Sequence, residues 1–131
     1  MEDYILKEID KIGKLIEAML SKLGVSVGSR RQETVYEVSR TELLEKLDLD
    51  IDTLLEQENL ADTLVREHGF SNSNLDKFAE LLFEFLLSAE DETFRRKLAA
   101  NIGAIYGYLE KHENTISFNK LHILREMKKY V

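Results

Sequence analysis

The spacing of apolar residues in the first segment constrains the fold more than any other feature of the sequence. Between residues 4 and 23, six apolar side chains recur at alternating intervals of four and three residues: Ile5, Ile9, Ile12, Ile16, Met19 and Leu23. Such intervals place side chains along one face of an α-helix. Leu6, Leu15 and Leu20 make this face wider than the two-position seam of a coiled coil. We therefore expect an amphipathic helix that packs on the core of its own chain, with a homodimer through this helix as the alternative.

Helical spacing continues along the rest of the chain, which has no proline and only six glycines. β-rich and loop-rich folds normally need more of both residues, so helices are favoured. Residues 75–89 are apolar nearly all round, which indicates a central helix contacted on several sides. Beyond residues 4–23, the pattern predicts helices over about 40–47, about 75–89, from the acids at 90–92 to about Lys111, and over about 117–130, with shorter ones around Ile51 and Leu60.

Capping residues and glycines mark several expected helix ends. Ser39 lies three residues before Glu42, which is the spacing of a capping box and predicts a helix that begins near residue 40. Gly69 follows the last apolar positions of its segment and is suited to the left-handed residue that closes a helix. Residues 34–38 are rich in β-branched and aromatic side chains, so they are either extended or an irregular start of the next helix.

The length of 131 residues is near the commonest size of a single domain, so one hydrophobic core is expected. We predict one all-α domain over residues 1–131, with six or seven helices. It divides into an N-terminal amphipathic helix over residues 1–23, a connector over residues 24–33 and a helical core over residues 34–131.

Charge argues against a nucleic-acid-binding role. The chain has 25 acidic residues against 18 lysines and arginines, a formal net charge of −7. Binding to nucleic acid relies on clustered positive charge, and each short basic cluster here has acids close by. The N-terminus is acidic where a secretory leader would be basic, and the longest apolar stretch, residues 81–87, is too short to span a bilayer. We therefore expect a cytoplasmic protein that binds neither nucleic acid nor membrane.

Three aspartates at alternate positions form the most suggestive polar motif. Asp48, Asp50 and Asp52 could ligate a divalent cation, but an EF-hand loop would need glycine at position 53 and glutamate at position 59, where the chain has Thr53 and Asn59. A phosphatase-type motif fails too, because neither register has threonine or valine four residues after its first aspartate. Aspartate accepts hydrogen bonds from the free N–H groups of a helix's first turn. We interpret the three as marking the end of one helix and the start of the next, with Asp50 or Asp52 as the cap.

The sequence GVSVG at residues 24–28 matches the nucleophile-elbow pattern around Ser26. That elbow lies between a strand and a helix, whereas the segment before it here is an amphipathic helix. His68, His112 and His122 follow in the order a catalytic triad would require, but no series of strands is present to build the sheet. We interpret residues 24–28 as a connector, and expect His112 to interact with the carboxyl end of a helix.

The remaining motifs that carry chemistry are missing from the sequence. Cysteine is absent, no histidine pair has metal-ligand spacing, and no glycine-rich phosphate loop occurs. We therefore predict no catalytic residue, no metal and no cofactor.

Two segments of the first half form a recognisable pattern: the opening EDYILKEIDKIGKLIEAML and the later LLEKLDLDIDTLLEQ. With these segments the chain resembles a family of small, uncharacterised bacterial helical proteins. The resemblance implies an all-helical fold and assigns no catalytic residue.

The second half has a pattern of small and apolar residues in two successive helices: Ala79, Phe83 and Leu86 in one, and Ile102, Gly103 and Tyr106 in the next. This pattern resembles a tetratricopeptide (TPR) helical hairpin. The closing proline and the early tryptophan of that repeat are missing, and the connection is about two residues longer. The resemblance implies a right-handed stack of helical hairpins; an irregular bundle is the alternative.

The sequence is compatible with two hypotheses about the function. The leading hypothesis is a non-catalytic helical module that binds an unidentified protein partner. The alternative is a small-ligand-binding protein or an enzyme whose site is assembled from residues distant in the sequence. A pocket with converging polar groups and perturbed acids would favour the alternative, and a shallow apolar groove would favour the module.

Overall fold

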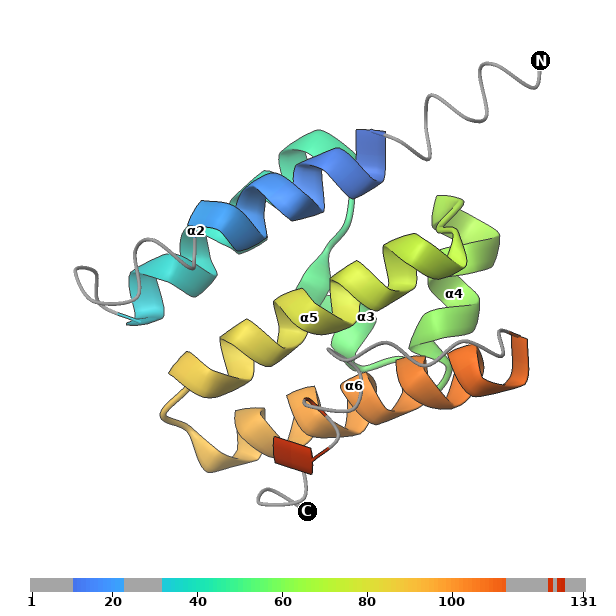
Figure 1. The fold of residues 1–131 in the computed structure, drawn as a ribbon. Helices are drawn as coiled ribbons and strands as arrows, with labels where there is room; N and C mark the ends of the chain where they lie inside the picture. The colour runs from blue at the N-terminus through green and yellow to red at the C-terminus, as the bar shows by residue number, and fades with distance from the viewer. Residues whose placement is uncertain (1–10, 23–31, 113–122, 124, 127–131) are drawn as a thin grey trace.

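The structure is a computed structural model that describes residues 11–22, 32–112, 123, 125 and 126. These residues form helices and short connections and contain no strand. Six helices run along them: one over residues 11–22, then α2 (Gln32–Leu47), α3 (Ile51–Leu55), α4 (Leu60–His68), α5 (Asn72–Ser88) and α6 (Glu92–His112). Figure 1 shows that they pack into a bundle, so the predicted all-α class is confirmed. A TPR-like stacking of hairpins stays a prediction.

Helix α5 lies at the centre of the bundle, as its apolar composition predicts. It packs along α6 and also contacts α2. In Figure 1 it lies between α6 on one side and the helix of residues 11–22 on the other. The apolar side chains that it buries are Leu75, Phe78, Ala79, Leu81, Leu82, Phe83, Phe85 and Leu86. Because these side chains cover most of its circumference, α5 can form contacts on several sides at once.

The helix of residues 11–22 packs on the core of its own chain. Ile12, Ile16 and Met19 are all buried, which confirms the predicted intramolecular packing for this part of the apolar face. Gly13 allows a close approach to α5, because a Cβ atom at this position would lie 2.9 Å from Oδ1 of Asn74. The other predicted members of the face, residues 5, 9 and 23, lie outside the described residues, and the oligomeric state stays a prediction.

The start of α2 differs from the expected start. This helix begins at Gln32 and continues through residues 34–38, so Ser39 lies inside the helix and is buried. The capping-box interpretation of Ser39 was therefore wrong, and the last two residues of the expected connector 24–33 are helical. A tertiary contact explains the difference: the Tyr36 ring packs against Phe85 of α5, and such a contact outweighs the weak strand preference of β-branched neighbours.

The boundaries of α4 and α5 follow local capping. Gly69 closes α4 in the left-handed conformation, with φ of 70°, as predicted. Helix α5 begins three residues earlier than expected, because the hydroxyl of Ser71 accepts a hydrogen bond from the Asn74 N–H at 3.1 Å. The expected helix over 117–130 lies almost wholly outside the described residues; Ile123 is helical and buried in the core.

Candidate functional site

Two of the three alternate aspartates have the predicted role at helix ends. Asp48 ends α2 in a left-handed conformation with φ of 55°, and its N–H donates to the Leu44 carbonyl at 3.1 Å. Asp50 is the N-cap of α3. Its carboxylate accepts from the N–H of Thr53 at 3.5 Å and from the Thr53 hydroxyl at 3.0 Å. These contacts confirm that Asp48 marks the end of one helix and that the carboxylate of Asp50 caps the next.

Asp52 has a different role from its two neighbours. Its Oδ1 accepts a hydrogen bond from the Tyr36 hydroxyl at 2.8 Å, and its Oδ2 accepts one from the Arg40 guanidinium at 2.7 Å. Arg40 also donates to Glu37 at 2.7 Å. Asp52 therefore connects the first turn of α3 to the side of α2, and the idea that it could cap a helix was wrong. Tyr36 and Arg40 reach the same carboxylate because residues four apart lie on one face of a helix.

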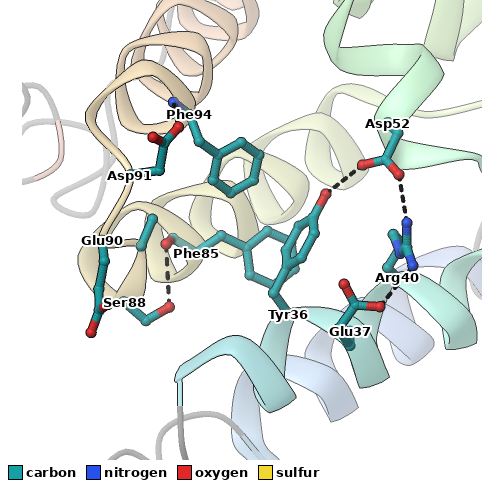
Figure 2. A pocket seen from close by; sticks show the side chains of 10 residues that line it. Tyr36, Glu37, Arg40, Asp52, Phe85, Ser88, Glu90, Asp91 and Phe94 are labelled. Carbon is teal, nitrogen blue, oxygen red and sulfur yellow. Dashed lines mark hydrogen bonds and ion pairs between the residues drawn. The ribbon is translucent and has the colours of Figure 1, made fainter.

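A pocket of about 400 Å³ opens beside this group of side chains. We call it the aromatic pocket; its lining residues are Tyr36, Glu37, Arg40, Asp52, Phe85, Ser88, Ala89, Glu90, Asp91 and Phe94. Figure 2 shows the tyrosine ring in the middle, with Glu37, Arg40 and Asp52 on one side and Glu90 and Asp91 on the other. Helices α2 and α3, the end of α5, the connection after it and the first turn of α6 all contribute side chains.

Three aromatic rings make up the apolar part of the pocket. The Tyr36 ring meets Phe85 and Phe94 edge to face, with ring centroids 5.1 Å apart in both pairs. Such a geometry adds a favourable electrostatic contact to the burial of the rings. Phe85 is buried in the core, whereas Tyr36 and Phe94 remain partly exposed. The buried Phe85 ring therefore forms the base of the pocket, and the partly exposed rings of Tyr36 and Phe94 can contact a ligand.

The connection between α5 and α6 is held by local hydrogen bonds. The Ser88 hydroxyl donates to main-chain carbonyls of α5, those of Glu84 at 3.1 Å and Phe85 at 3.2 Å. Asp91 accepts from the N–H of Phe94 at 2.8 Å, which caps the start of α6. These bonds fix the positions of the pocket residues on this side.

Tyr36, Arg40 and Asp52 shift one another's pKa values. Partial burial of Asp52 raises its pKa, but hydrogen bonds from Arg40 and Tyr36 outweigh burial and bring the pKa below its ordinary value. The pKa of Tyr36 is raised, first by burial and then by its bond to Asp52. The pKa of Arg40 is raised by the same carboxylate and by Glu37. At neutral pH the phenol is protonated and Asp52 is ionised.

The other polar residues considered as candidates do not come together in the described structure. Ser26 and His122 lie outside the described residues. The ring of His112 stacks on Tyr108, with centroids 4.0 Å apart. Its Nδ1 lies 2.9 Å from the Tyr108 carbonyl oxygen at the end of α6, which confirms the expected contact with a helix end. His68 lines a smaller hollow of about 140 Å³, together with Lys11 and Lys46.

Among the described residues, no group of three or more histidine or acidic side chains is placed to hold a metal ion. None of the described helices is both long and apolar enough to cross a membrane.

Sequence reasoning did not find the aromatic pocket. The signal was present in the spacing of Tyr36 and Arg40, which share a face if residues 34–38 are helical. Nothing in the sequence indicates that this face meets Asp52 and Phe94, which belong to two other helices.

In comparisons with known proteins, no family model, no curated protein and no solved structure matches the chain. The two resemblances noted in the sequence therefore stay predictions.

Proposed function

We propose that the protein is a cytoplasmic, non-catalytic helical module that binds a segment of another protein at the aromatic pocket. The observation that carries this proposal is the pairing within the pocket. Asp52 bonds to Tyr36 and Arg40, and Arg40 also bonds to Glu37. Each of these groups helps to position the others, and neither of the two histidines that the structure describes lines the pocket to act as a base.

The composition of the pocket supports a protein partner. Tyrosine, phenylalanine and arginine are enriched at protein interfaces because they combine a large apolar surface with a polar group. Tyr36, Phe94 and Arg40 provide this combination on a partly exposed surface. The volume of about 400 Å³ is sufficient for one large side chain of a bound segment.

The hairpin of α5 and α6 supports the same proposal. The two helices lie side by side (Figure 1). They are joined by residues 89–91, which line the pocket. In a TPR-like stack, surfaces formed by neighbouring helices serve as binding surfaces for partners. A small-ligand site is the alternative, and the pocket volume is compatible with it.

The proposal is tested by affinity purification with matched variants, followed by mass spectrometry. Phe94→Lys blocks the pocket, and Leu44→Lys places the same residue at a position that is 49% exposed and does not line it. We expect a partner that the unchanged protein and Leu44→Lys retain and Phe94→Lys loses, with circular dichroism confirming that both variants are folded. A partner retained by Phe94→Lys would contradict the proposal, and co-purification of a small molecule alone would favour the alternative.

A further inference from the structure

The charged side chains that line the aromatic pocket are mostly negative. Among the described residues, four carboxylates line it, those of Glu37, Asp52, Glu90 and Asp91, against one guanidinium, that of Arg40. Two of the carboxylates already bind Arg40, each at 2.7 Å. The other two belong to the connection between α5 and α6, on the opposite side of the tyrosine ring (Figure 2).

The carboxylates of that connection have no cation bound to them in the described part of the chain. Asp91 accepts the N–H of Phe94 as a helix cap, and Glu90 is exposed and forms no ion pair with a described residue. The nearest basic residues along α6 have other contacts. Arg95 donates to the carbonyl of Ala89. Arg96 pairs with Glu92, and Lys97 pairs with Glu56.

Aromatic rings beside carboxylates favour a cationic ligand. The face of a tyrosine or phenylalanine ring attracts an ammonium or guanidinium group, and the attraction increases when the cation is partly removed from water. An aliphatic stem can cover the apolar rings while the charged end reaches the carboxylates. A neutral side chain would gain only from burial, and an anion would be repelled.

We propose that the aromatic pocket binds the side chain of a lysine or arginine of the partner, with the stem against Tyr36 and Phe94 and the charge beside Glu90 and Asp91. That this side chain belongs to a partner protein rests on the proposed function. The preference for a cation rests only on the residues that line the pocket. The proposed function and the preference for a cation can therefore be disproved independently of each other.

The test uses small probes and the full-length chain. N-acetyl-lysine-methylamide and its arginine counterpart are titrated against the isotope-labelled protein and followed by amide chemical shifts. N-acetyl-norleucine-methylamide has a similar stem without the charge, and the glutamate counterpart reverses the charge. We expect both cationic probes to bind about tenfold more tightly than norleucine, with shift changes at the pocket residues. Of the four probes, only the cationic ones should bind more weakly when salt is added.

A matched pair of double variants separates the local charges from the overall charge. Glu90→Gln with Asp91→Asn removes two charges and keeps the helix cap, since asparagine caps as well as aspartate. Glu58→Gln with Glu67→Gln removes two exposed charges that do not line the pocket. We expect the first pair to weaken lysine binding by about threefold and leave norleucine unchanged. The second pair should change neither the affinity for the lysine probe nor the affinity for the norleucine probe.

Two results would overturn the inference. Equal affinity for the lysine and norleucine probes would show that charge is irrelevant, and absence of binding by any probe would show that the pocket does not take a side chain. If the cationic probes bind as expected and purification yields no protein partner, the inference stands and the proposed function fails.

Discussion

Two aromatic clusters lie on α5, and they differ in exposure. Near its start, Phe70 and Phe78 meet edge to face with centroids 5.7 Å apart, and both are buried. Near its end, Phe85 meets Tyr36 in the same geometry, but Tyr36 and Phe94 remain partly exposed. Edge-to-face contacts alone therefore do not distinguish core from site.

The surroundings of the two clusters explain the difference. Phe78 has apolar neighbours from the core of the bundle, and the turn at Gly69 brings Phe70 beside it. The cluster around Tyr36 is bordered by charged side chains that bond to one another at the surface. We infer that the first cluster stabilises the fold and that the second is available for binding.

The largest expected difference concerns stability. Phe78→Ala should lower the free energy of unfolding by about 3–5 kcal/mol, because it removes a fully buried ring and leaves a cavity. Phe94→Ala should cost about 1–2 kcal/mol, since its ring is partly exposed and water can fill the space. Urea denaturation followed by circular dichroism measures both. Equal losses would remove the distinction between the clusters.

A smaller effect is expected at Asp52 and should depend on pH. Its pKa is lowered in the folded state by Arg40 and Tyr36, against the opposing effect of burial. The unfolded chain therefore binds a proton more readily, so the contribution of Asp52 to stability is present above about pH 4 and is lost as the pH falls through the folded-state pKa.

Asp52→Asn should cost less than about 1 kcal/mol at pH 7, because the ion pair is about half exposed. The difference between the two proteins should shrink as the pH falls from about 5 to about 2. Urea denaturation at several pH values measures it. A constant difference over this range would show that the charge of Asp52 is not involved.

Glu84 of α5 should show the opposite sign. Burial raises its pKa in the folded state, so the folded chain holds the proton more tightly and stability falls as the pH rises through that pKa. Glu84→Gln should stabilise the fold by roughly 0.5 kcal/mol at pH 7, a value reduced for partial exposure. Thermal denaturation at pH 4 and pH 7 compares the variants. A variant less stable than the parent at pH 7 would contradict this account.

The smallest effect is expected at Asp50. Asp50→Asn keeps a side-chain oxygen for the cap of α3, so stability should change by less than about 0.3 kcal/mol. The same chemical change two residues away, at Asp52, serves as the comparison. A larger loss at Asp50 than at Asp52, measured by urea denaturation, would reverse the roles assigned to the two carboxylates.

The sequence predicted the elements whose signals are local. The apolar face that contains Ile12 and Ile16, the closing role of Gly69 and the cap at Asp50 follow from spacing and residue type, and the structure confirms them. The start of α2 could not be predicted in this way, because Tyr36 is held by residues of α3, α5 and α6.

The candidate site was missed for the same reason. Its residues come from three parts of the chain, around Tyr36, Asp52 and Phe94, and only their packing brings them together. No spacing within one helix reports a contact between helices. The role of Asp52 shows this most clearly, because its position in a first turn suggests a cap, whereas its hydrogen bonds are to α2.

We expect the aromatic cluster of Phe70 and Phe78 to stabilise the fold and the cluster around Tyr36 to bind the ligand. The most direct test measures the free energy of unfolding and the affinity for N-acetyl-lysine-methylamide in the same two variants, Phe78→Leu and Phe94→Leu. We predict that Phe78→Leu loses more stability and keeps the affinity of the unchanged protein, while Phe94→Leu loses little stability and most of the affinity. Parallel losses of stability and affinity in both variants would contradict the claim.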